Sequence, residues 1–291
     1  MHKLFTKILV PVNFNRNTGL AVDKAIQLAN YFDCDIHLIY VQTPAATIPF
    51  LFNGFFSGSL INPPNKKCAD LLKELEDRSK EKLLDGLLIT SAIVMGSWQS
   101  VLKQTIIAEH IDLVIIPKTR IKFGNALIQQ IDLNKLSQQT QCPVLTVTRS
   151  FNINHLQNIV VPINDSLPVR KLSIATYMCR MACGSIHLMG SGGNSYGSRE
   201  DRRCLIKAYQ LLSDYGHIKI YCSLQENYNN PATTLAYARN VKADMIVVNT
   251  GKESLLKGWW NRLRGKYLYN ESDIPVLTIA HQQDRVHLTL N

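Results

Sequence analysis

Two asparagines are candidate ligand-binding residues. Asn13 ends the run Val-Pro-Val-Asn, and Asn164 ends the run Val-Pro-Ile-Asn, each directly after a short apolar segment. An asparagine amide both donates and accepts hydrogen bonds but carries no charge. At the end of a strand, such a group can hydrogen-bond a ligand.

The other candidate residues indicate neither a catalytic group nor a metal site. His37 and His187 occupy matching positions in Ile-His-Leu runs, but no nucleophile or carboxylate accompanies them, which favours structural histidines. The glycine-rich run Gly190–Gly193 lacks the Lys-Ser/Thr pair of a phosphate loop. The seven cysteines include no Cys-x-x-Cys, so we expect reduced thiols, no metal and no catalytic residue.

The composition is that of a globular protein with a mild basic excess. The 291 residues carry a formal net charge of +10 that is spread over both halves, with 46% hydrophobic and 19% charged residues. A spread excess is more typical of solubility than of a polyanion site, and we predict no nucleic-acid partner. The first residues lack the apolar core of a signal peptide, and we expect a cytoplasmic protein.

Four runs of the first half recur in the same order in the second half. The matching pairs are 7–13 with 158–164, 36–38 with 186–188, 110–116 with 242–248, and 142–147 with 274–279. Four ordered matches indicate a duplicated domain. A polar stretch that starts at Ser150 separates the copies, which predicts domains at 1–150 and 151–291.

Within each copy, short β-branched runs alternate with longer amphipathic runs, as in a parallel sheet covered by helices. Strands are predicted at 7–12, 35–41, 88–94, 112–116 and 143–148, and at 158–163, 185–190, 217–222, 244–248 and 275–280. Helices are predicted at 18–32, 66–86, 98–109 and 125–139, and at 168–182, 198–215, 231–241 and 253–269. The predicted fold class is α/β, with two tandem doubly wound parallel five-stranded sheets.

A doubly wound sheet binds its ligand beyond the carboxyl ends of the strands, at the point where the strand order reverses. In the first half, this rule places the candidate cleft around Asn13, Val41 and the loop 117–124. In the second half, it places the cleft around Asn164, Gly190 and the loop 249–258.

The repeated runs resemble the universal stress protein family. The likeness is carried by the Val-Pro-Val-Asn strand, the Ile-His-Leu strand, the Asp-Leu-Val-Ile-Ile strand and the closing Cys-Pro-Val-Leu-Thr-Val strand, over 5–149 and again over 156–281. The resemblance implies a flavodoxin-like or adenine nucleotide alpha hydrolase-like fold. It also implies that the two domains pair through their last strands, 143–148 and 275–280.

Many members of that family bind ATP through a loop of the form Gly-x-x-Gly-x9-Gly-Ser after the fourth strand. Counted back from the closing proline, the loop's glycine and serine positions fall on Pro117, Arg120 and 130–131, and on Asn249, Lys252 and 262–263. None of them is a glycine, and proline has no N–H group to offer a phosphate. Asn13 and Asn164 replace the family's acidic residue. We therefore expect degenerate loops and no cofactor, ATP included.

The residues left at the expected clefts are Asn13, Val41, Arg120, Asn164, Gly251 and Lys252. Arg120 and Lys252 can meet an anion through their side chains, although solvated loop charges are commoner. The segment 251–269 is basic and amphipathic, and packing on the sheet is a commoner outcome for it than binding to a membrane surface.

The predicted function is a non-catalytic stress-response protein of the universal stress type. We expect it to act by binding a protein partner or a small anionic ligand. The alternative is a family member that binds or weakly hydrolyses ATP through a rebuilt loop.

Overall fold

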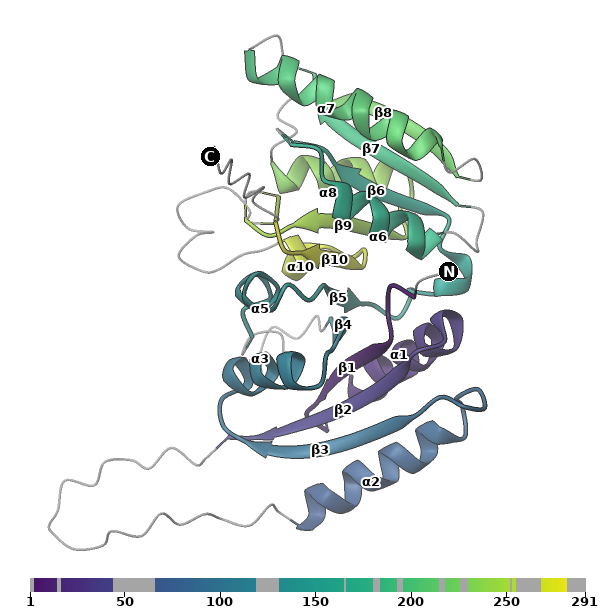
Figure 1. Cartoon of the computed structure of the whole chain (residues 1–291), viewed down its shortest axis with the longest axis vertical. Coiled ribbons are helices and arrows are strands. Elements are labelled where there is room, and N and C mark those ends of the chain that lie inside the picture. Colours follow the sequence, from purple (N-terminus) through teal and green to yellow (C-terminus); the bar gives the residue numbers. More distant parts are fainter. Residues whose placement is uncertain are drawn as a thin grey trace, which may run out of the picture.

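Ten strands form one continuous sheet in a computed structural model of the chain (Figure 1). Their order is β3-β2-β1-β4-β5-β10-β9-β6-β7-β8. The structure describes residues 3–14, 17–43, 66–118, 131–164, 166–179, 184–192, 196–214, 218–225, 230–251, 253–254 and 268–281.

The first half contributes β1 to β5, which are mutually parallel. Its strands are β1 (Lys7–Val12), β2 (Asp35–Gln42), β3 (Ile89–Met95), β4 (Leu113–Pro117) and β5 (Val144–Val147). Its helices are α1 (Thr18–Phe32), α2 (Lys66–Lys80), α3 (Trp98–Ala108) and α5 (Leu133–Thr140), and a short 3-10 turn η1 (Ile153–His155) leads into the second half.

The second half repeats this order with β6 to β10, which are also mutually parallel. Its strands are β6 (Asn158–Pro162), β7 (Ser185–Ser191), β8 (Lys219–Gln225), β9 (Met245–Asn249) and β10 (Val276–Ile279). Its helices are α6 (Val169–Cys179), α7 (Tyr196–Ser213), α8 (Pro231–Asn240) and α10 (Leu268–Glu271). The α/β fold with doubly wound parallel strands is confirmed, and the two sets of five strands join in one sheet.

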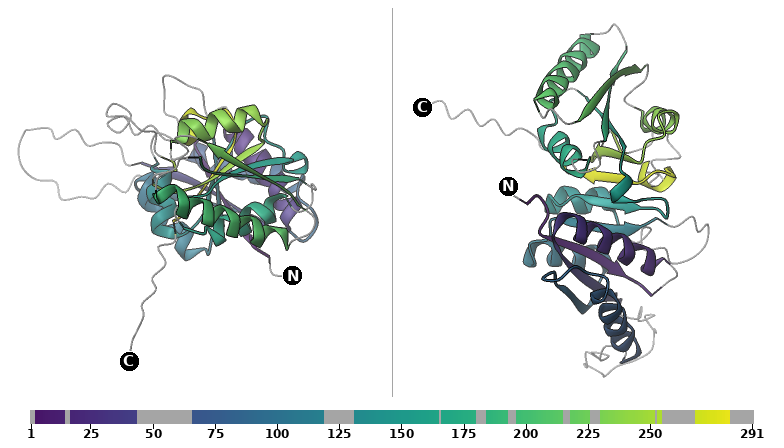
Figure 2. Two further views of the ribbon diagram at one scale, coloured as in Figure 1. Left: turned by 90° about the horizontal axis from the view of Figure 1, so that it is seen from above. Right: turned by 90° about the vertical axis from the view of Figure 1, so that its right-hand side faces the viewer.

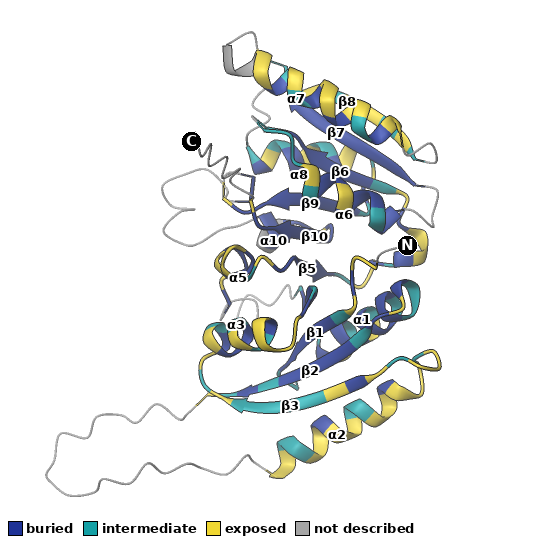
Figure 3. Cartoon of the chain, in the orientation of Figure 1, coloured by how far each residue is buried: buried dark blue, intermediate teal, exposed yellow. Residues whose placement is uncertain are grey.

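Helices lie on both faces of the sheet, so most strands are covered twice (Figure 2). One core is built with side chains of α1, α2, α6 and α7, and the other with side chains of α3, α5, α8 and α10. Each of the two cores contains residues of both halves. Burial is deepest in the central strands, whereas the edge strands β3 and β8 are partly exposed (Figure 3).

The two halves meet where β10 pairs antiparallel with β5, the strands expected to join them. Leu277 lies opposite Leu145, and both are fully buried. Thr146 adds side-chain hydrogen bonds across the seam, because its hydroxyl donates to the Val276 carbonyl at 3.2 Å and accepts from the Val276 N–H at 3.3 Å. An antiparallel seam places the carboxyl ends of β1–β5 and of β6–β10 at opposite edges of the sheet.

The repeated aspartate of the Asp-Leu-Val-Ile-Ile run has the same structural contacts in both halves. Asp112 Oδ2 accepts the backbone N–H groups of Thr6 and Lys7 at 2.8 and 3.3 Å. Asp244 Oδ2 accepts those of Gln157 and Asn158 at 2.9 and 2.8 Å. Each carboxylate thus holds the start of the first strand of its half, and the sequence repeat extends to individual hydrogen bonds.

Some element ends differ from the sequence expectation. The helix predicted at 66–86 ends at Lys80, because turns with bonds from Lys82 N–H to the Ser79 carbonyl and from Leu83 N–H to the Lys80 carbonyl follow it. Of the helix predicted at 125–139, residues 125–130 lie outside the described residues. The described part is α5, which begins at Leu133 after Asp132 caps it by accepting the Lys135 N–H at 3.0 Å. Most of the helix predicted at 253–269 lies outside the described residues.

The shared cores predict that the two halves unfold together. Leu277→Ala should leave a cavity at the seam and cost about 2–5 kcal/mol, whereas Leu224→Ala, at a β8 residue that is 50% exposed, should cost about 1 kcal/mol or less. Urea unfolding followed by circular dichroism and fluorescence should show one transition in both variants. Two separate transitions, with only one shifted by Leu277→Ala, would contradict a common core.

Candidate functional site

The strand order reverses between β1 and β4 in the first half and between β6 and β9 in the second. Asn13 directly follows β1, and Asn164 lies two residues beyond β6. β4 ends at Pro117 and β9 ends at Asn249. The sequence-predicted asparagines therefore lie at the two places where this fold class forms ligand clefts.

A carboxylate of the chain itself lies at the second of these places. Glu253 Oε1 accepts hydrogen bonds from Asn164 Nδ2 at 2.5 Å and from Lys171 Nζ at 2.9 Å. Glu253 Oε2 accepts from the Asn249 N–H at 2.6 Å and from Lys171 Nζ at 2.8 Å. Each carboxylate oxygen thus has two donors, which satisfies the group without water.

The Lys171–Glu253 ion pair is deeply buried. The side chains of Lys171 and Glu253 are 1% and 6% exposed, and Lys171 also donates to the Pro162 carbonyl at the end of β6. Burial lowers the pKa of Lys171, and the Glu253 carboxylate opposes part of that shift. A buried ammonium is costly unless it is paired and hydrogen-bonded. The contacts to Glu253 and Pro162 meet this requirement.

The turn after β9 brings Glu253 into position. Gly251 has φ +92°, a conformation that residues with a Cβ rarely adopt. Its carbonyl accepts the Ser254 N–H at 3.2 Å. Ser254 is fully buried, and its hydroxyl lies 2.8 Å from Asn134 Oδ1 on α5 of the first half. The segment that carries Glu253 is therefore held from both halves.

The first cleft lacks two features of the second. β4 ends at Pro117, which has no N–H group to match that of Asn249. The sheet-facing side of α1 buries only Thr18 and apolar side chains, whereas α6 buries Lys171. Asn13 Oδ1 accepts a hydrogen bond from the Thr18 hydroxyl at 3.2 Å. Val41 is 3% exposed and belongs to the core, so it presents little surface to a ligand.

The structure joins Asn164 and the turn at Gly251 in one site, while Arg120 and Lys252 lie outside the described residues. Sequence reasoning missed Lys171 and Glu253. A signal for Lys171 was present, because it shares the buried face of α6 with apolar residues, which are Leu172, Ile174, Ala175 and Met178. A lysine on such a face requires a buried anion, but the sequence does not show which acidic residue supplies it.

The paired histidines have structural environments. His37 Nδ1 lies 2.8 Å from the Thr90 hydroxyl. His187 stacks on Tyr221 with ring centroids 4.9 Å apart, and its Nδ1 lies 3.3 Å from the Tyr237 hydroxyl. Each histidine is 8% exposed, and burial is the main cause that lowers the pKa of both. Both side chains are expected to be neutral at pH 7.

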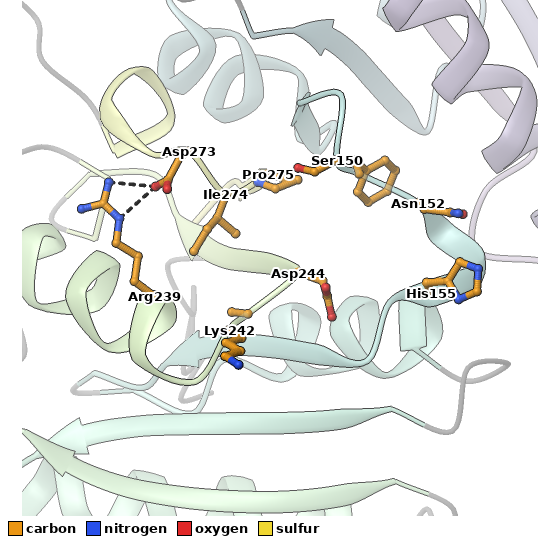
Figure 4. A pocket seen from close by; sticks show the side chains of 11 residues that line it. Ser150, Asn152, His155, Arg239, Lys242, Asp244, Asp273, Ile274 and Pro275 are labelled. Atoms are coloured by element: carbon orange, nitrogen blue, oxygen red, sulfur yellow. Dashed lines mark hydrogen bonds and ion pairs between the residues drawn. The ribbon is translucent and has the colours of Figure 1, made fainter.

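A pocket of about 350 Å³ lies at the opposite edge of the second half, beside the segment that links the halves (Figure 4). Its acidic groups are already engaged. Asp273 binds Arg239 at 2.8 and 2.9 Å, and Asp244 holds the start of β6. The two aspartates of this pocket therefore have structural roles. The polar cluster at the β6–β9 switch point is the stronger candidate site.

Among the residues that the structure describes, no three or more His, Cys, Asp or Glu side chains gather as a metal site would require. None of the helices in the same part of the chain has the length and apolar character of a membrane span.

Residues 4–148 match the model of the Universal stress protein family. The matched region runs from the start of the first half to the end of β5, and so contains all five strands of that half. No curated protein matches the chain.

Solved structures extend the likeness of fold beyond residues 4–148 to nearly the whole chain. A universal stress protein from Archaeoglobus fulgidus aligns with a TM-score of 0.65 at 13% identity, covering 97% of this chain and 99% of that one. A protein of unknown function from Pseudomonas aeruginosa aligns with a TM-score of 0.58 at 17% identity, covering 95% and 92%. The cytoplasmic domain of a prokaryotic cation chloride cotransporter aligns with a TM-score of 0.53 at 10% identity, covering 94% and 95%. At these identities, the alignments show a shared fold.

A double-mutant cycle tests the buried pair. Glu253→Gln leaves Lys171 without its anion and should destabilise the protein by about 3–5 kcal/mol. Lys171→Met combined with Glu253→Gln should cost clearly less than the sum of the single changes, because no unpaired charge remains. The measurement is the free energy of unfolding in urea at pH 7.

The matched control is the exposed pair Lys82–Asp23, whose side chains are 60% and 55% exposed. Lys82→Met and Asp23→Asn should each cost less than about 1 kcal/mol. Additive losses at Lys171 and Glu253 would show that the two side chains do not depend on each other.

Acid should destabilise the fold through the buried histidines. The pKa of an unfolded-state histidine is about 6.5, and those of His37 and His187 in the folded state are lower. Below about pH 6.5, the unfolded state therefore binds protons that the folded state does not. The free energy of unfolding then decreases as the pH is lowered. The urea midpoint between pH 7 and 5 should fall less steeply in a His37→Gln/His187→Gln variant. Equal slopes in this variant and in the unmodified protein would refute this origin.

Proposed function

We propose that this chain is a tandem universal stress protein, with domains at 1–150 and 151–291, that acts in the cytoplasm by binding rather than by catalysis. Its ligand is a protein partner or a small anionic molecule, and its role is in a stress response. The family match over 4–148 supports this assignment for the first half. The repeated strand order and the repeated aspartate contacts support its extension to the second.

The observation that carries the binding proposal is the position of the Glu253 carboxylate. It lies against the end of β9 and beside Asn164, where this fold class would place a ligand. A nucleotide phosphate at the same place would bring a second negative charge next to a buried carboxylate. The cost of that repulsion favours a cleft that does not hold ATP in the usual family manner.

The end of β4 in the first half also supports the absence of a nucleotide site. A phosphate beside the end of β4 would meet Pro117, which offers no backbone donor, where a glycine-rich loop would offer N–H groups. The environments of His37 and His187 also fit structural roles better than proton transfer. We therefore propose degenerate nucleotide loops in both domains and no enzymatic activity.

The test is the nucleotide content and nucleotide response of the purified protein. Acid extraction should release less than one-tenth of an equivalent of adenine nucleotide, and millimolar ATP with Mg²⁺ should leave Tm unchanged. The control is the Lys171→Met/Glu253→Gln protein, which removes the buried carboxylate charge. Stoichiometric ATP in the extract, or a saturable rise in Tm of the unmodified protein with ATP–Mg²⁺, would instead establish the nucleotide-binding alternative.

A further inference from the structure

The donors around Glu253 match a carboxylate in the number of contacts. Lys171 Nζ contacts both oxygens, Asn164 Nδ2 contacts one, and the Asn249 N–H contacts the other. A carboxylate offers about four acceptor positions on its two oxygens. The cleft supplies four contacts to them, two on each oxygen, and so recognises the whole group.

The donors and the acceptor come from different kinds of structure. Asn249 ends a buried central strand, and Lys171 lies in the first turn of α6 with its Nζ held against the end of β6. Glu253 lies in a turn four residues beyond β9. Two of the three donors, Lys171 and the Asn249 N–H, are therefore part of the framework of the domain, and Asn164 follows β6. The carboxylate is brought to them on a short connection.

The fold alone does not require this buried charge. α1 covers the equivalent part of the first half without burying a charged side chain. Replacing a buried ion pair by apolar residues is often neutral or stabilising. The buried ion pair is thus not needed for the fold, and all four acceptor positions of its carboxylate have donors. Because it lies where this fold class binds ligands, ligand recognition explains it better than stability does.

We propose that Lys171, Asn164 and the Asn249 N–H form a carboxylate-binding site, and that Glu253 occupies it as an internal ligand. A small molecule that carries a carboxylate is the external ligand, and it binds by displacing Glu253. This inference rests on the proposed binding function and names the chemical class of the ligand.

Displacement of Glu253 would change contacts with the first half of the chain. The next residue, Ser254, is fully buried against Asn134 of α5, and its carbonyl accepts the Leu268 N–H at 2.7 Å. α5 also reaches the seam, where the Ser137 hydroxyl donates to the Thr278 carbonyl at 3.5 Å. Movement of Glu253 therefore changes contacts between the two halves, which gives the site a means of signalling occupancy.

The test uses formate and acetate as probes of the full-length Glu253→Ala protein. Removing the internal carboxylate opens the site, so sodium formate should raise Tm by about 2 °C or more above an equal concentration of sodium chloride, and the rise should saturate. The unmodified protein should show no such rise, because its tethered carboxylate competes at a high effective concentration.

The matched control is Lys171→Met/Glu253→Ala, which keeps the opened site but removes its cation. It should show no formate-specific rise. An equal rise in the two variants, or none in Glu253→Ala, would overturn the proposal. If Glu253→Ala does not fold in chloride, the same comparison is made on refolding yield in formate and in chloride, with the same two outcomes.

The result is separable from the test of the proposed function. Absence of a formate effect with no bound ATP would remove the carboxylate site and leave the non-catalytic binding protein. A formate effect in Glu253→Ala, together with stoichiometric ATP in the unmodified protein, would retain the site and remove the degenerate nucleotide loops.

Discussion

The second half of the chain depends on the compensation of one buried charge. An ammonium group that leaves water loses several kcal/mol of solvation, even after the protein relaxes around it. Lys171, with a side chain that is 1% exposed, therefore requires a partner, and the turn after β9 supplies Glu253. That requirement fixes the position of Glu253 beside the end of β9. It also places a carboxylate where other proteins of this fold class bind a ligand, so one electrostatic constraint shapes both the stability and the chemistry of the cleft.

The seam between the halves determines how the two clefts relate. Because β5 and β10 run antiparallel, the two switch points lie at opposite edges of the sheet, and one ligand cannot bridge them. The two halves are connected instead by side-chain contacts of α5. α5 belongs to the first half but contacts Ser254 beside the second cleft and the end of β10 at the seam. A change at the second cleft can reach the first half through this helix, while the shared cores keep the two halves together.

The fold was largely readable from the sequence, because strands buried on both faces produce apolar β-branched runs and their helices produce a period of 3.6. The repeat added the position of the switch points, and with them Asn13 and Asn164. The site was only partly readable. Lys171 and Glu253 are 82 residues apart, and no local pattern joins them. Helix ends such as Lys80 were also missed, since turn hydrogen bonds rather than periodicity set them.

We propose that Glu253 occupies the β6–β9 switch point and that the second half of the chain does not hold ATP there. A crystal structure of the protein grown with millimolar ATP and Mg²⁺ tests this most directly. The Glu253 carboxylate is expected between Lys171, Asn164 and the Asn249 N–H, with no nucleotide beside it. A nucleotide bound at the end of β9, with Glu253 turned away from Lys171, would contradict it.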